Sequence, residues 1–165
     1  MKNSLYIFDF DDTLAISDSK VKITNNGVVK YYNSHEFATY QFKPGDEMDA
    51  SDFTRLVNPQ IIKKYFDVFL KIYKAVGRKA MILTARGDPK PVKEFLDSQG
   101  MTGIQIVALG SINSAADKRD WIERAIKRGV NDILFVDDAA ETIAAVKGLR
   151  KKYPTVRIDA RLAVK

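Results

Sequence analysis

Three aspartates end an apolar run near the N-terminus, where Asp9, Asp11 and Asp12 are followed by Thr13. Carboxylates crowded at one place repel one another, so an opposite charge must compensate them. Because side chains alternate along an extended segment, Asp9 and Asp11 project to one side and Asp12 to the other. We therefore expect chemistry from Asp9 and Asp11, a turn or capping role for Asp12, and a backbone-capping role for Thr13.

A second acidic pair, Asp137 and Asp138, ends another apolar run. Beside Asp9 and Asp11, this pair would raise the pKa values of the whole group and repel phosphate unless a divalent cation lay among the carboxylates. The chain contains no cysteine and a single histidine, far away in sequence. Oxygen ligands alone favour a hard ion, and Mg²⁺ is the natural choice.

Residues suited to phosphate binding occur at two further places. The hydroxyl of Thr84 and the adjacent backbone at Ala85 can hydrogen-bond phosphate oxygens, and Arg86 is either a second clamp or the ion-pair partner of Asp88. Lys118 begins a helical pattern, where its charge adds to the preference of helix N-termini for anions. The sequence thus offers a nucleophile, an acid, phosphate clamps and a metal site.

The elements that position these residues follow from the hydrophobic pattern, in which short apolar runs alternate with amphipathic stretches. We predict strands at 5–10, 79–85, 104–110, 132–138 and 155–161, and helices near 59–76, 89–99, 117–128 and 139–151. Asn58-Pro59 predicts the start of the first helix, with asparagine as the cap. The pattern is typical of an α/β fold, a doubly wound parallel sheet of about five strands with helices on both faces.

Ligands of such a sheet bind outside the carboxyl ends of the strands, where the strand order reverses. A chain that winds out one way from the first strand and returns to its other side makes the first and fourth strands neighbours. We therefore expect Asp9, Asp11, Asp137 and Asp138 to meet at this point.

An insert interrupts the alternation, because about 45 residues separate the first strand from the first long helix, too many for a plain connection. Asn26-Gly27 lies between two β-rich arms and is a strong hairpin signal. We predict one domain over residues 1–165 with a flap or small cap at about 16–58, standing over the end of the first strand. The alternative is a surface hairpin without a role.

Several side chains of the insert are candidates for recognition. The aromatic ones are Tyr31, Tyr32, Tyr40 and Phe42. They would either stack on a base or bury the insert against the core. We expect the single histidine, His35, to be an insert residue without an acid–base role.

Composition limits the class of protein. The chain has 165 residues, of which 45% are hydrophobic and 29% charged, as in an ordinary globular protein. Its apolar runs are far shorter than the ~20 residues that span a bilayer, and no signal peptide is visible, so we expect a cytoplasmic protein with no membrane association. The net charge of +6 comes with basic residues along two helical patterns. These residues form either solvated faces or a surface for a polyanion, and no obligate protein partner is evident.

The order of these residues resembles the motifs of the haloacid dehalogenase-like (HAD) superfamily, which are here Asp9-x-Asp11-x-Thr13, Thr84, Lys118 and Asp137-Asp138. A DxDxT motif alone arises by chance in many proteins. Four motifs in order, each on a suitable element and together spanning nearly the whole chain outside the insert, form a specific signature.

The resemblance implies a mechanism with Asp9, Asp11 and Lys118 as catalytic residues. Asp9 would attack phosphorus in line and form an aspartyl-phosphate, for which an ionised carboxylate needs no activating base. Asp11, which the dehalogenases of the superfamily lack, would protonate the leaving oxygen and later deprotonate water. Relatives hold the metal through the counterparts of Asp9, the backbone carbonyl of Asp11 and an acid in the register of Asp138, with Asp137 as a direct or water-mediated helper.

The function predicted on this basis is a Mg²⁺-dependent phosphomonoesterase. Small inserts leave the site of such enzymes open to macromolecular ends, so the short insert and the basic helices favour a nucleotide or a nucleic-acid terminal phosphate. The alternatives are a sugar phosphate or other small metabolite, a phosphoprotein, transfer to another hydroxyl as in phosphomutases, and a binding module without turnover. No kinase loop of the GxxxxGK[ST] type is present.

Overall fold

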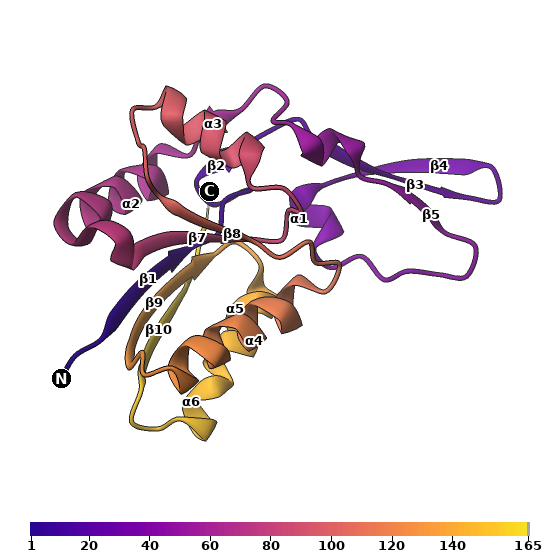
Figure 1. Cartoon of the computed structure of the whole chain (residues 1–165). Coiled ribbons are helices and arrows are strands. Elements are labelled where there is room, and N and C mark those ends of the chain that lie inside the picture. The colour runs from indigo at the N-terminus through magenta and orange to yellow at the C-terminus, as the bar shows by residue number, and fades with distance from the viewer. Residues whose placement is uncertain (165) are drawn as a thin grey trace.

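A five-stranded parallel sheet forms the centre of the computed structural model, which describes residues 1–164 (Figure 1). Its order is β10-β9-β1-β7-β8, with β1 at Ser4–Phe8, β7 at Ala80–Thr84, β8 at Gln105–Ala108, β9 at Asp132–Asp137 and β10 at Arg157–Leu162. Tyr6 of β1 pairs with Ala80 on one side and with Leu134 on the other. The α/β fold and the neighbourhood of the first and fourth predicted strands are confirmed.

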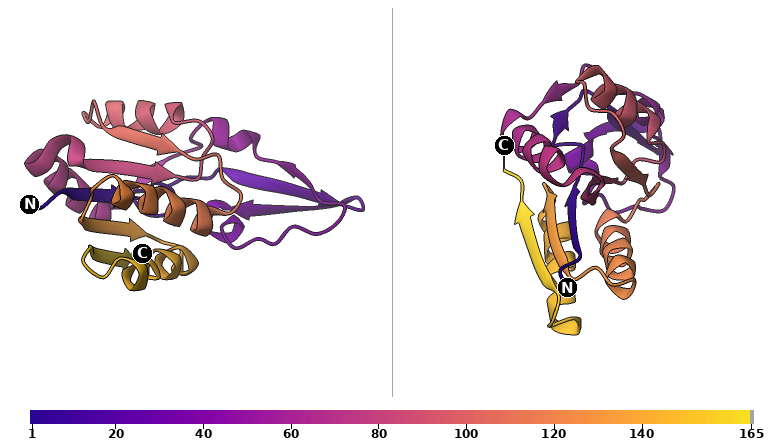
Figure 2. Two further views of the ribbon diagram at one scale, coloured as in Figure 1. Left: turned by 60° about the horizontal axis from the view of Figure 1, so that its bottom comes forward. Right: turned by 60° about the vertical axis from the view of Figure 1, so that its left-hand side comes forward.

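Helices cover both faces of this sheet (Figure 2). They are α2 (Lys63–Val76) and α3 (Lys90–Ser98) on one face, and α4 (Ser114–Lys127), α5 (Ala140–Lys147) and α6 (Leu149–Lys152) on the other. The alternation of side chains along β1 explains the two layers. Phe8 packs edge-on against Phe69 of α2, with ring centroids 5.1 Å apart, whereas Ile7 packs with Ile122 of α4 in the opposite layer.

The first long helix begins at Lys63, so the start predicted from Asn58-Pro59 is wrong. Asn58 has a φ of 48°, in the left-handed region, and Gln60–Ile61 forms the short strand β6. This strand pairs antiparallel with β2 (Ala15–Ile16). The pairing joins the two ends of the insert, and this long-range contact overrides the local helix signal.

The insert between β2 and β6 forms its own antiparallel sheet, in the order β4-β3-β5. Its elements are β3 (Lys20–Asn25), β4 (Val28–Asn33), α1 (Ser34–Phe37), β5 (Glu47–Asp49) and the 3₁₀ helix η1 (Ser51–Thr54). Asn26 and Gly27 have φ values of 49° and 75° and form the two-residue turn between β3 and β4, as positive φ at both positions requires. Figures 1 and 2 show the insert beyond the carboxyl ends of the parallel strands.

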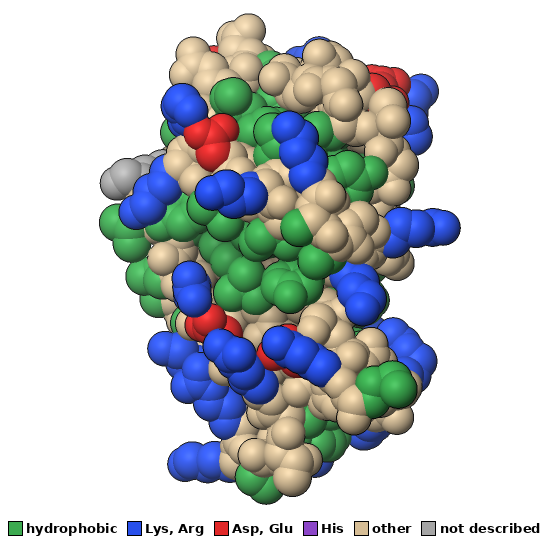
Figure 3. Space-filling model, turned by 90° about the vertical axis from the view of Figure 1, so that its left-hand side faces the viewer, with side chains coloured by type: hydrophobic (Ala, Val, Ile, Leu, Met, Phe, Trp, Pro, Cys, Tyr) green, Lys and Arg blue, Asp and Glu red, His purple; other side chains and the backbone are tan. Residues whose placement is uncertain are grey.

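Basic side chains surround a central apolar area on the face shown in Figure 3, which is the side of the molecule away from the insert. Several lysines on α2 and α3 pair with acidic residues one turn along the helix, as Lys63 does with Asp67 and Lys93 with Asp97. Such pairs are typical of solvated helix faces. Among residues 1–164, no helix is both long and apolar enough to cross a membrane.

Candidate active site

Three carboxylates meet at the carboxyl ends of β1 and β9. Asp9 directly follows β1, Asp137 ends β9, and Asp138 comes next. One carboxylate oxygen from each lies within 4.8 Å of the others. Asp9 and Asp137 are only 6% and 1% exposed. The parallel pairing of the two strands therefore places a buried acidic cluster at the predicted point.

Lys118 supplies the opposite charge to this acidic cluster. Its Nζ donates to Asp9 Oδ1 and to Asp137 Oδ2, both at 2.8 Å. Because α4 begins at Ser114, three residues before the predicted start, Lys118 lies in the second turn of the helix and not at its N-terminus. Burial lowers the pKa of Lys118, but the charges of Asp137 and Asp9 outweigh burial and raise it, so the ammonium stays protonated.

The acidic cluster carries more negative charge than Lys118 neutralises. Burial raises the pKa of Asp9 well above its ordinary value, the carboxylate of Asp137 raises it further, and Lys118 opposes both. Burial also raises the pKa of Asp137. Close oxygen donors with an excess of negative charge suit a hard divalent cation. The donor set of Asp9, Asp137 and Asp138 thus fits the predicted metal.

Thr13 belongs to this site, although we expected it to cap the loop backbone. Its side chain is fully buried, and its hydroxyl donates to Asp9 Oδ2 at 3.1 Å. The same hydroxyl lies 3.5 Å from Asp138 Oδ1. Lys118 and Thr13 therefore hold one oxygen each of the Asp9 carboxylate, which fixes its orientation.

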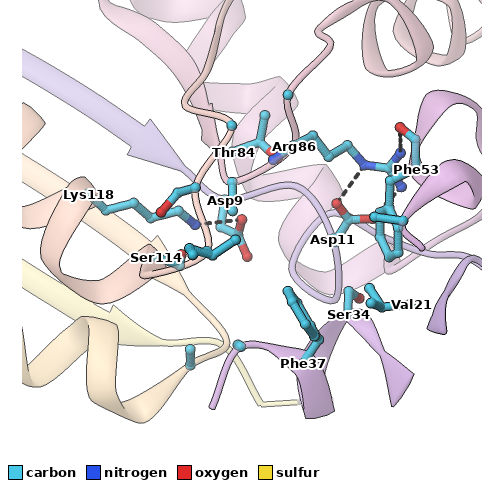
Figure 4. Close-up of a pocket in the computed structure, with 18 of the residues that line it drawn as sticks. Asp9, Asp11, Val21, Ser34, Phe37, Phe53, Thr84, Arg86, Ser114 and Lys118 are labelled. Carbon is cyan, nitrogen blue, oxygen red and sulfur yellow. Dashed lines mark hydrogen bonds and ion pairs between the residues drawn. The ribbon is translucent and has the colours of Figure 1, made fainter. Parts of the chain in front are cut away.

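Asp11 lies apart from the acidic cluster and faces Arg86 (Figure 4). Arg86 Nε donates to Asp11 Oδ2 at 2.7 Å and Nη2 to Oδ1 at 2.8 Å, which is a bidentate pair. Nη1 of the same side chain donates to the backbone carbonyls of Phe53 and Arg55 in the insert, at 3.0 and 3.1 Å. The partner of Arg86 is therefore Asp11, and the alternative of an ion pair with Asp88 is wrong.

All of the residues predicted for the site line one pocket of about 270 Å³. They are Asp9, Asp11, Thr84, Ala85, Arg86, Lys118, Asp137 and Asp138. The buried hydroxyl of Thr84 accepts a hydrogen bond from the backbone N–H of Arg86 at 3.2 Å, which leaves its own proton free to point at a ligand. The pocket brings the predicted phosphate-binding side chains together with the acidic cluster.

Helix α1 of the insert touches the site at two residues that sequence reasoning did not assign to it. The hydroxyl of Ser34 donates to Asp12, whose φ of 63° lies in the left-handed region. His35 Nδ1 lies 2.6 Å from Asp138 Oδ2. Because 103 positions separate His35 from Asp138, no local spacing in the sequence signals this contact.

Comparison of the chain with protein-family models, with curated proteins and with solved structures finds no match. The site combines the oriented carboxylate of Asp9 with the buried ammonium of Lys118 and two further acids beside a pocket. Such a site can support attack on an electrophile that carries negative charge, provided that a cation offsets the excess negative charge of the acids.

Proposed function

We propose that the protein is a Mg²⁺-dependent phosphomonoesterase that acts through an aspartyl-phosphate on Asp9. The observation that carries this proposal is the contact of Lys118 with both Asp9 and Asp137, beside Asp138, in a pocket that also contains Thr84. The order and placement of these residues support the resemblance to the HAD superfamily. A cysteine-free chain suits the reducing cytoplasm, which we propose as its location.

Asp9 is the nucleophile in this proposal. Its carboxylate forms a bond to phosphorus while the bond from phosphorus to the leaving oxygen breaks, and the leaving oxygen takes a proton from Asp11. Water, deprotonated by Asp11, then attacks the aspartyl-phosphate, releases inorganic phosphate and restores Asp9. Lys118 and Thr13 hold Asp9 in one orientation throughout, and the Thr84 hydroxyl donates to a phosphate oxygen.

Asp138 is the better metal ligand of the acidic pair. Buried Lys118 and the backbone N–H of Ala139 hold the two oxygens of Asp137 at 2.8 and 2.9 Å. The partners of Asp138 are easier to displace, because Thr13 lies 3.5 Å away and His35 is an exposed side chain. Mg²⁺ held by Asp9, Asp138 and the backbone carbonyl of Asp11 would neutralise the acidic excess, so that a phosphate dianion can bind. Asp137 then acts mainly by positioning Lys118.

Asp11 must exchange partners before it can act as a general acid. Its two carboxylate oxygens are bound to Arg86, which also holds the insert through the carbonyls of Phe53 and Arg55. We propose that the insert is a cap over the site and that substrate entry moves Asp11 from Arg86 to the leaving oxygen. Once released from Arg86, Asp11 takes up a proton from water, and this is the proton that it gives to the leaving oxygen. The proposed substrate is a nucleotide or the terminal phosphate of a nucleic acid, because the cap is short and the chain is basic.

The test is phosphate release, with Mg²⁺ or with EDTA, from an aryl phosphate, mononucleotides, sugar phosphates and phosphorylated oligonucleotides. We expect Mg²⁺-dependent turnover that is lost in D9N, which keeps the shape of the side chain and removes the nucleophile. D67N is the matched control, because Asp67 is an exposed aspartate on α2 that pairs with Lys63 on the same helix. Turnover that survives in D9N, or the absence of turnover from a folded protein across the whole panel, would refute the proposal.

A further inference from the structure

The pocket has two chemically different halves. The acidic cluster, Lys118 and Thr84 form a polar half. The other half, called apolar for its large side chains, also borders Ser34 and the Asp11–Arg86 pair. Its apolar residues are Val21, Phe37, Met48, Phe53 and Ile112. Four of these five come from the insert, whereas Ile112 follows β8 in the main fold. A phosphate bound at the polar half would therefore direct the rest of its molecule toward an apolar surface.

Two aromatic rings, Phe37 and Phe53, line this apolar half. Figure 4 shows Phe37 pointing from α1 into the space beside Asp9 and Asp11. Phe53 lies under the guanidinium of Arg86, with the central carbon 4.8 Å from the ring centroid. Phe53 is thus held in place before any ligand enters, and preorganised aromatic groups lose little entropy on binding.

Other aromatic residues of the insert support Phe37. Tyr40 stacks on Phe37 at an interplanar angle of 13°, and Phe42 meets it edge-on at 85°. Tyr32 packs in turn against Tyr40, with ring centroids 4.9 Å apart. Of residues 1–164, the pocket lining includes Phe37 but none of Tyr31, Tyr32, Tyr40 and Phe42. The side of the Phe37 ring that faces away from the pocket is thus packed against other aromatic residues of the insert.

We infer that this apolar half binds a planar aromatic ring of the leaving group. The preferred substrates are therefore phosphomonoesters that carry such a ring, with nucleoside monophosphates as the biological case, and not sugar or polyol phosphates. The inference deepens the proposed phosphatase function and rests on it. Rings stack on aromatic side chains, so the base of a nucleotide adds an apolar contact that a sugar phosphate cannot make.

The size of the pocket limits what enters with the phosphate. Its volume of about 270 Å³ lies just below the ~300–1,000 Å³ typical of pockets that enclose a drug-sized ligand. One ring system fits, and further nucleotides of a strand would have to lie outside. The same ring chemistry can thus come from a free mononucleotide or from the last nucleotide of an oligonucleotide.

The experiment compares two substrates that differ only by the base, adenosine 5′-monophosphate and ribose 5-phosphate. We expect wild type to prefer the nucleotide in kcat/KM by roughly 5- to 150-fold, the range that base stacking on an aromatic side chain provides. F37A should lower this preference, because it should raise KM for the nucleotide by a larger factor than KM for ribose 5-phosphate. A 5′-phosphorylated dinucleotide with the same terminal base shows whether the enzyme prefers a free mononucleotide or the end of an oligonucleotide. F37A should lower kcat/KM for whichever of the two is preferred.

Two further variants keep the test decisive. Y31A is the matched control, because Tyr31 is an aromatic residue of the insert that is 62% exposed and does not line the pocket, and it should keep the preference. I112A tests the same surface from outside the insert, and Ile112 is 63% exposed, so its truncation leaves the fold intact. I112A should also lower the preference for the nucleotide. Equal turnover of the two substrates by wild type, or equal losses on both in F37A and I112A, would refute the inference and leave the phosphatase function standing. No release from either substrate or from an aryl phosphate would refute the function itself.

Discussion

Lys118→Met removes the positive charge of the acidic cluster with little change in side-chain length. Lys118 is 2% exposed and bonds both Asp9 and Asp137, so the variant leaves two buried carboxylates without their partner. Removal of one member of a buried ion pair typically destabilises a protein by about 3–5 kcal/mol. For a chain of 165 residues, each kcal/mol lowers Tm by about 2–4 °C, so we expect Tm to fall by roughly 6–20 °C in metal-free buffer.

The loss of stability in K118M should depend on pH in a defined direction. Burial raises the pKa of Asp9 well above its ordinary value, and Lys118 is the group that opposes this rise. A carboxyl group whose folded-state pKa is raised contributes stability at low pH, which is lost as the pH rises through that pKa. Without Lys118 the pKa of Asp9 rises further. K118M should therefore come closest to wild type in acid and fall furthest behind it at pH 8.

Mg²⁺ should restore part of the stability that K118M loses. A cation that binds only the folded protein stabilises it by about 2.7 kcal/mol at 100 times its dissociation constant. K118M gives the cation more unpaired negative charge than wild type does, so the rise in Tm on adding Mg²⁺ should be larger in the variant.

The assay is thermal unfolding followed by circular dichroism at pH 8, first with EDTA and then with Mg²⁺. K127M is the control, since Lys127 is an exposed lysine on the same helix and its loss should change stability by no more than about 0.5 kcal/mol. If K118M unfolds within about 2 °C of wild type in EDTA, where each kcal/mol is worth about 2–4 °C, the acidic cluster does not depend on Lys118 and the argument from charge is refuted.

Two other predictions follow from individual contacts. T13V keeps the shape of Thr13 but loses its hydrogen bond to Asp9. Such a bond is worth about 0.5–1.5 kcal/mol, so single-turnover phosphate release should slow by roughly two- to tenfold, and an unchanged rate would contradict the orienting role. Hydrogen bonds from Lys152 and Tyr153 lower the pKa of Glu123 from 4.5 to about 2. A lowered pKa stabilises the fold above 4.5 and loses this effect as the pH falls toward 2, so urea unfolding of E123Q should depend less on pH than wild type in this window.

The sequence predicted the site well where the chemistry depends on the ends of strands. Asp9 directly follows β1 and Asp137 ends β9, and parallel strands present their carboxyl ends on one edge, so the strand order alone brings the two acids together. Lys118 was assigned from its place after the third predicted strand. A shift of three residues in the start of α4 did not matter, because the long lysine side chain reaches Asp9 from the second turn.

The sequence predicted less where the insert meets the main fold. Alternation along a hairpin fixes which residues share a face but not which face turns to the core. Phe37 ends α1, and Tyr40 and Phe42 follow in the loop after it, outside the hairpin, so only their packing shows that Phe37 lines the pocket. The sequence also could not show the partner of Arg86, because Asp11 lies 75 positions away.

The insert is bound to two of the groups that the proposed chemistry needs. His35 contacts Asp138, and Arg86 joins Asp11 to the carbonyl of Phe53. A cation at Asp138 competes with His35 for the same carboxylate, and a leaving oxygen competes with Arg86 for Asp11. Each turn of the reaction must therefore break contacts that hold the insert over the pocket. Since such movements limit the rate of many enzymes, we expect the position of the insert and the rate of turnover to be coupled.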